Sequence, residues 1–129
     1  MYDKIKNEPY EQYLKVTQEG GKEIKYLPWA VCWDMLKKYF PNSKYEWVIA
    51  DFDGKKIAGA YQPDGSWIIH CKITIKHEGE TYIHNEYSYT EEKTSENDSN
   101  DSLEDVFRKT LAKGVSMMTG FGIKLWFDK

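Results

Sequence analysis

The sequence predicts an α+β fold in which a helix, an antiparallel sheet of three to four strands and a C-terminal helix follow one another. Two patterns predict it. Residues 26–42 and 101–119 carry apolar side chains at helical spacing, and residues 45–89 between them alternate in polarity and are divided by turn residues. A length of 129 residues suits one folding unit, so we expect residues 1–129 to form a single domain.

The first 25 residues are polar and mixed, and their pattern is weak. Residues 8–18 could form a short helix, which Gly20 and Gly21 would end. The next segment, YLPWAVCWDMLKKYFPN, is much clearer. Pro28 suits the first turn of a helix, where its missing N–H costs nothing, and Pro41 stops the helix. The apolar stripe of this helix consists of Trp29, Cys32, Trp33, Leu36 and Phe40.

Strands are expected next. Residues 45–49 (YEWVI) favour a strand, and the Asp53-Gly54 pair predicts a tight turn into a second strand at residues 56–60. A further turn at residues 63–65 leads into SWIIHCKITIK, which alternates in polarity. Its apolar row is expected to be Trp67, Ile69, Cys71, Ile73 and Ile75, and its polar row His70, Lys72, Thr74 and Lys76.

A hairpin follows if Glu78 and Gly79 form the centre of the next turn. Thr74 then lies opposite Ile83, and Lys72 lies opposite Asn85. One face of the sheet is therefore expected to form the core, and the other to be a solvent-exposed surface that bears Lys72 and Lys76.

The last third of the chain begins with an acidic segment. Residues 90–102 contain no apolar side chain, so we expect a mobile loop there. A helix is predicted to start near Asp101 and Ser102 and to end at Gly120, and residues 123–127 (IKLWF) are expected to form a short final strand or sheet edge. The expected buried face of this helix consists of Leu103, Val106, Phe107, Leu111, Val115 and Met118.

The net charge of −3 is unevenly distributed. Residues 91–105 hold seven acidic residues against one lysine, so the rest of the chain has 17 basic and 14 acidic residues. The total charge therefore neither supports nor excludes a nucleic-acid ligand. Without an apolar run of membrane-spanning length or an apolar N-terminal signal, we expect no membrane association and a location in the cytoplasm.

Sequence signals for enzymes are missing. There is no phosphate-binding loop, dinucleotide fingerprint or GxSxG elbow, so we expect a non-enzymatic protein without a cofactor. His70, His77 and His84 are expected to point in different directions rather than to share a metal. Asp51 and Asp53 could resemble a nuclease pair but are better explained by the turn. Cys32 and Cys71 are expected to be reduced core thiols.

Two segments resemble the Sak group of phage single-strand DNA annealing proteins. They are YLPWAVCWDMLKKYFPNSKYEW at residues 26–47, where Pro28 replaces the usual serine, and VFRKTLAKGVSMMTGFGIKLW at residues 106–126. The layout is also similar to the Rad fifty-two superfamily, which has a β-β-β-α core. The resemblance implies ATP-independent binding of single-stranded DNA and annealing of complementary strands in phage homologous recombination, inside a bacterial host cell.

The same resemblance implies a homo-oligomer, as a ring or filament, with a phage exonuclease or a single-strand binding protein as candidate partners. It places Tyr26 beside the DNA and Lys113 in a basic cluster, where Ser116 replaces a second arginine. The expected DNA-binding residues are Lys113, Lys109, Arg108, Tyr26, Lys25, Lys72 and Lys76. Two alternatives remain open: a protein-interaction domain with a basic face, and a small α+β ligand-binding domain.

Overall fold

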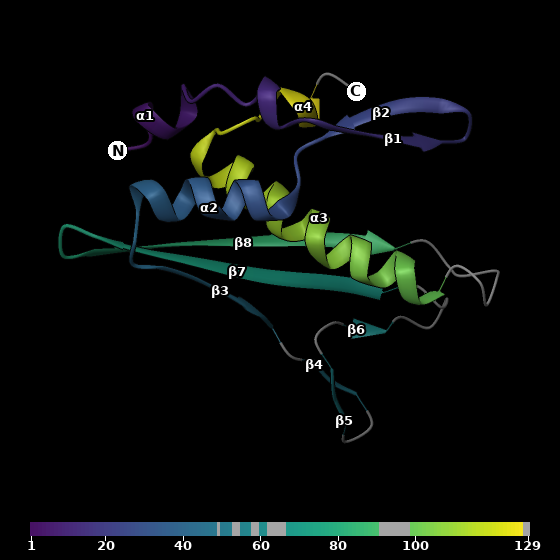
Figure 1. The fold of residues 1–129 in the computed structure, drawn as a ribbon. Coiled ribbons are helices and arrows are strands. Elements are labelled where there is room, and N and C mark those ends of the chain that lie inside the picture. Colours follow the sequence, from purple (N-terminus) through teal and green to yellow (C-terminus); the bar gives the residue numbers. More distant parts are fainter. Residues whose placement is uncertain (49, 53–54, 58–59, 62–66, 91–98, 128–129) are drawn as a thin grey trace.

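The computed structural model describes residues 1–48, 50–52, 55–57, 60–61, 67–90 and 99–127. It confirms the α+β class, with an antiparallel sheet and a long C-terminal helix (Figure 1). The elements are α1 (Asp3–Lys6), a 3-10 turn (Glu11–Tyr13), β1 (Lys15–Glu19), β2 (Lys22–Tyr26), α2 (Trp29–Tyr39), β3 (Ser43–Trp47), β4 (Ala50–Phe52), β5 (Lys55–Ile57), β6 (Ala60–Tyr61), β7 (Trp67–His77), β8 (Glu80–Thr90), α3 (Ser99–Thr119) and α4 (Lys124–Phe127).

The main sheet is built around β7. β8 pairs with β7 along its whole length, and β3 and β6 share its other edge. The predicted register is confirmed: Thr74 pairs with Ile83, and Lys72 pairs with Asn85. The turn is centred on Glu78 and Gly79, whose φ values of 52° and 81° are those of a tight left-handed hairpin turn.

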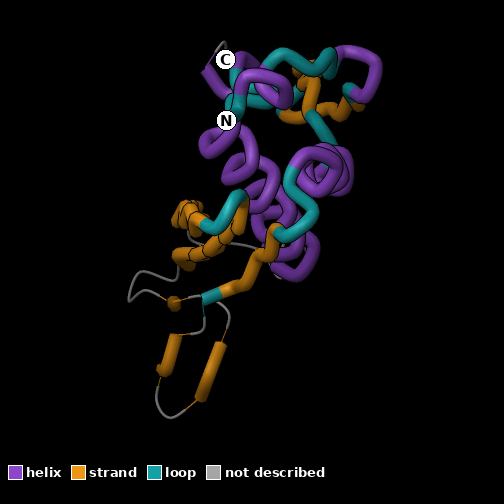
Figure 2. Tube along the Cα trace, turned by 90° about the vertical axis from the view of Figure 1, so that its left-hand side faces the viewer, coloured by secondary structure: helices purple, strands orange, loops and turns teal. Residues whose placement is uncertain are grey.

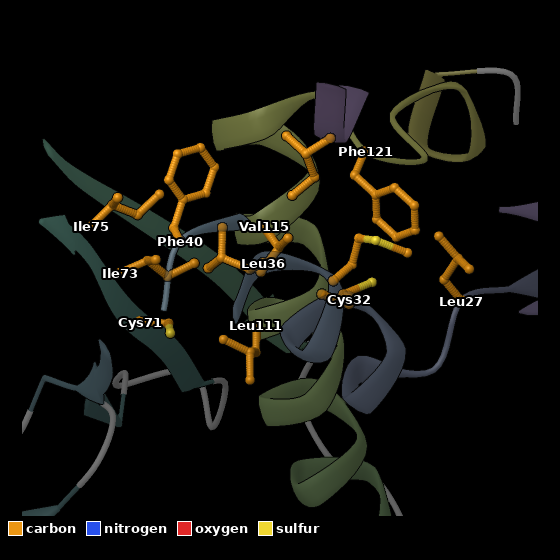
Figure 3. Close-up of a cluster of buried hydrophobic side chains, with 13 residues drawn as sticks. Leu27, Cys32, Leu36, Phe40, Cys71, Ile73, Ile75, Leu111, Val115 and Phe121 are labelled. Carbon is orange, nitrogen blue, oxygen red and sulfur yellow. The ribbon is translucent and has the colours of Figure 1, made fainter. Parts of the chain in front are cut away.

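Two helices cover one face of this sheet and leave the other uncovered among the described residues (Figure 2). α3 packs directly on β7 and β8, and α2 packs on α3. The inward side chains of Ile69, Cys71, Ile73 and Ile75 on β7 are completely buried, as the alternation predicted. The close-up in Figure 3 shows side chains of this core, which includes Cys32, Leu36, Phe40, Cys71, Ile73, Ile75, Leu111, Val115 and Phe121.

Both cysteines lie in this core as free thiols. Burial raises the pKa of the Cys32 thiol to about 12, so the thiol stays protonated at neutral pH. Trp29 departs from the predicted stripe of α2, because it is 37% exposed while Met35 is buried instead.

The N-terminal prediction was wrong. Residues 8–18 form a 3-10 turn and then β1, which pairs with β2 across Gly20 and Gly21. Val16 and Thr17 are β-branched and favour the extended backbone, and the two glycines take φ values of 57° and 79° in the hairpin turn. The hairpin of β1 and β2 is a separate two-stranded sheet.

The C-terminal prediction was also wrong. Residues 124–127 form the short helix α4, held by local bonds such as the one from the Trp126 N–H to the Ile123 carbonyl at 3.0 Å. Such bonds close within the segment itself, so it needs no partner strand. Gly120 and Gly122, at φ values of 87° and 64°, turn the chain between α3 and α4.

Other element boundaries shift by a few residues. β3 begins at Ser43, and the strand expected at 56–60 is instead the end of β5 and the start of β6. α3 begins at Ser99, before the predicted start at Asp101, so residues 99–102 of the expected loop are helical. Residues 91–98 of that loop lie outside the described residues, as do the turns at 53–54 and 63–65. No described helix is long and apolar enough to span a membrane.

Candidate functional site

A pocket of about 320 Å³ lies between the β1–β2 hairpin, the start of α2, the first half of α3 and α4. Figure 1 shows this hairpin on the other side of α3 from the main sheet. The pocket combines cationic and aromatic side chains from segments far apart in the sequence. Those important for its chemistry are Lys25, Tyr26, Trp29, Arg108, Lys109 and Trp126.

Local structure explains how the first wall forms. β2 runs directly into α2 through Leu27 and Pro28, and Pro28 occupies the N-cap position. The Leu27 side chain is buried at 7% exposure and anchors this corner. Because the corner is fixed, Tyr26 and Trp29 stay at the surface on either side of it, at 40% and 37% exposure.

The second wall is one stripe of α3. Asp105, Arg108, Lys109 and Ala112 recur at the three- and four-residue spacing that places side chains on one helix face. The small Ala112 side chain is buried, whereas both cations are exposed. The helix thus presents two positive charges beside Lys25 of β2.

Each of the two α3 cations that line the pocket has an acidic neighbour one turn earlier. The Lys109 Nζ atom lies 3.0 Å from Asp105 Oδ2, and Arg108 Nη2 lies 3.8 Å from Glu104 Oε2. Exposed pairs of this kind are worth only about 0.3–0.5 kcal/mol. An anionic ligand that contacts more than one cation can therefore displace them.

Lys113 is placed differently. Its Nζ atom lies 3.5 Å from Oε2 of Glu86, a β8 residue that is only 9% exposed and whose Oε1 lies 2.9 Å from His84 Nε2. Lys113 therefore contacts the sheet and does not line the pocket. Ser116, the neighbour that the resemblance pointed to, is completely buried on α3.

Lys72 and Lys76 lie on the uncovered face of the main sheet, away from the pocket. Lys72 pairs across to Glu46 of β3, with 3.7 Å between the Nζ and Oε1 atoms. The seven predicted residues therefore fall in three places. Lys25, Tyr26, Arg108 and Lys109 come together in the pocket, Lys113 contacts β8, and the two β7 lysines lie behind the sheet.

In the described part of the chain, no three histidine, cysteine or acidic side chains are grouped so that they could hold a metal ion. His70 and His84 pair with Tyr87 and Ile73 and so lie on opposite faces of the sheet, as expected. Asp53 lies outside the described residues, and the side chain of Asp51 is not described.

Sequence reasoning missed several parts of the pocket. Thr17 was missed because a helix was expected in place of β1, and Ile24 because no strand was expected at β2. Trp126 was missed because a strand was expected in place of α4. A usable signal existed for the hairpin, since Gly20 and Gly21 separate two five-residue segments rich in β-formers and lysine.

The family comparison agrees with the resemblance seen in the two end segments. The model of the family described as Sak Single Strand Annealing Protein matches residues 6–127, nearly the whole chain. Neither the curated proteins nor the solved structures contain a significant match.

Proposed function

Because the chain belongs to the Sak single-strand annealing protein family, we propose that it binds single-stranded DNA and anneals complementary strands without nucleotide hydrolysis, in phage recombination. It acts as a binding protein and not as an enzyme. Single-stranded DNA is its ligand, it works as a homo-oligomer in the host cytoplasm, and a phage exonuclease or a single-strand binding protein cooperates with it.

The observation that carries this proposal is the composition of the pocket. Lys25, Arg108 and Lys109 meet there although more than 80 residues separate the first from the others. Clustered cations bind phosphates by releasing counterions, irrespective of base sequence. Tyr26 and Trp29 add exposed rings on which unpaired bases can stack. A duplex, whose bases are already stacked on each other, gains nothing from those rings.

The test is annealing of two complementary labelled oligonucleotides without ATP, over a salt series. The variant carries Lys25→Ala with Lys109→Ala. The matched control removes two exposed lysines that do not line the pocket, Lys4 of α1 and Lys22 of β2. We expect the protein and its control to accelerate annealing, and the pocket variant to be much slower than both.

Binding of one labelled strand gives a second readout. The slope of log K against log salt should fall by about 0.7 for each phosphate that the protein no longer neutralises, so by about 1.4 in the pocket variant. If the unmodified protein neither bound the strand nor accelerated annealing at low salt, the proposal would be wrong. If the control variant were impaired as much as the pocket variant, the pocket would not be the site.

The volume of the pocket favours a second candidate, a small anionic ligand. About 320 Å³ lies at the lower end of the range for small-molecule sites. Oligonucleotide length separates the two functions. A strand-binding groove gains affinity steadily from a mononucleotide to a long oligonucleotide, whereas a small-ligand site binds the mononucleotide as tightly as the longer strands.

A further inference from the structure

The uncovered face of the main sheet is the second surface with unusual chemistry. α2 and α3 cover the opposite face, and Figure 2 shows no described element over this one. Three large side chains of β8 point outward here: Ile83 is 54% exposed, Tyr87 54% and Tyr89 59%. An apolar row of this kind on a surface strand indicates a binding surface.

The aromatic half of this face is held in place by the strands. The His70 ring of β7 stacks on the Tyr87 ring of β8, with centroids 4.3 Å apart and planes at 25°. His70 is held in turn by Asn85, whose Oδ1 atom lies 2.9 Å from His70 Nε2. Tyr89 lies two residues further along the same face. Because the rings sit on paired strands, little side-chain freedom is given up when a flat ligand stacks on them.

The cationic half lies on β7 and β3. Lys72 and Lys76 flank Thr74 on the outward row, and Lys44 of β3 lies directly opposite Thr74. Glu46 belongs to the same outward row of β3 and pairs with Lys72. Three lysines against this one acid make the β3–β7 side of the face positive.

Charge argues against a second copy of the chain as the occupant. If two copies packed face to face, each lysine group would meet the other copy's lysines or its aromatic row, depending on the direction of the two-fold axis, and would gain no anionic partner in either case. An apolar peptide would leave the same lysines without anionic partners. A single strand of nucleic acid satisfies both halves, because it carries phosphates and flat bases side by side.

We propose that this sheet face binds a single strand of nucleic acid, with unpaired bases on Tyr87 and Tyr89 and phosphates on Lys44, Lys72 and Lys76. It is a second site, separated from the pocket by the sheet and α3. The proposal deepens the function proposed above and rests on it for the class of ligand. One protomer then holds a strand on each side.

Photo-crosslinking tests the contact directly. A single-stranded oligonucleotide that carries 5-iododeoxyuridine is bound to the full-length protein and irradiated, and the cross-linked peptides are mapped by mass spectrometry. We expect adducts on β8 at Tyr87 or Tyr89, in addition to adducts in the pocket. A duplex competitor should remove the β8 adducts far less effectively than a single strand.

Affinity gives the matching measurement. In protein that already carries the two pocket substitutions, Lys25→Ala and Lys109→Ala, the remaining strand binding should depend on the sheet face. We expect Tyr87→Ala to weaken it at least fivefold, since one base–aromatic stack is worth about 1–3 kcal/mol. Tyr87→Phe is the control, because it keeps the ring and removes only the hydroxyl group.

The outcomes separate the two sites. If β8 gives no adducts and Tyr87→Ala binds like Tyr87→Phe, the sheet-face proposal is wrong while binding in the pocket can still stand. If β8 adducts persist and the pocket substitutions do not change strand affinity, the pocket is not a DNA-binding site, and the sheet-face proposal stands. If Tyr87→Ala leaves strand affinity intact and lowers the oligomer mass in sedimentation, the face is a subunit interface and the proposal is overturned.

Discussion

Gly114 lies on the side of α3 that packs against β7 and β8, and its replacement by alanine probes that packing. An added Cβ atom would lie 2.8 Å from Ile73 Cδ1 and 3.2 Å from Glu86 Cβ, whereas ordinary contacts begin near 3.4 Å. The Ile73 side chain is completely buried, so its end has no open space to move into. α3 would have to shift by about 0.6 Å to restore an ordinary contact.

Two effects of Gly114→Ala oppose each other. Alanine stabilises a helix interior by about 1 kcal/mol relative to glycine, whereas overpacking of a filled core costs about 1–3 kcal/mol. We expect the clash to dominate and the free energy of unfolding to fall by about 1 kcal/mol. Tm should then fall by about 4 °C in a thermal melt followed by circular dichroism.

A double-mutant cycle with Ile73→Val isolates the clash. Valine lacks the Cδ1 atom, and alone it should cost about 0.5–1.5 kcal/mol. Combined with Gly114→Ala, it makes room for the new methyl group, so the double variant should be more stable than the sum by about 1 kcal/mol. Additive effects, or a Gly114→Ala protein that is more stable than the parent, would refute the close approach of α3.

Three further predictions concern charge. Asp105→Asn removes the carboxylate that competes with phosphate for Lys109 in the pocket, so the affinity for single-stranded DNA should rise about twofold. The control Glu80→Gln, at the β7–β8 turn, should leave this affinity unchanged. The Cys32 thiol, with its pKa raised to about 12, should react with iodoacetamide at pH 8 only after denaturant unfolds the protein. The hydrogen bond from Tyr39 lowers the pKa of Glu8, so the ionised carboxylate stabilises the fold above the unfolded-state pKa of 4.5. This stabilisation is lost as the pH falls through the lowered pKa of the folded state. Tyr39→Phe removes the hydrogen bond, and the midpoint of acid unfolding should therefore move to higher pH.

The hairpin of β7 and β8 could be predicted in detail because its signals agree with one another. Eight residues that alternate strictly, Ile69 to Lys76, define the buried face, and Glu78 with Gly79 defines the turn, so only one register satisfies both. Val16 is 52% exposed in β1, so no burial pattern distinguishes that strand from a polar helix. The first hairpin was missed for this reason.

The candidate site shows a similar limit. Lys109 and Lys113 were both expected to bind DNA, and they are four residues apart, but four residues of a helix turn through about 400°. The extra 40° is enough to point Lys109 into the pocket and Lys113 toward Glu86 of β8. Which of the two lysines faces the sheet depends on how α3 packs in the folded protein, and the helix sequence alone does not determine this.

Salt should weaken binding at both surfaces, because each combines cations with aromatic rings. Phosphate contacts to the lysines of the sheet face depend on counterion release and so weaken as salt rises. Stacking on Tyr87 releases no counterions and so persists as salt rises. In protein that carries Lys25→Ala and Lys109→Ala, Tyr87→Ala should therefore lower strand affinity by a similar factor at low and at high salt, whereas Lys72→Ala should lower it mainly at low salt. If Tyr87→Ala lost its effect as salt rose, stacking on this ring would not be the source of the affinity.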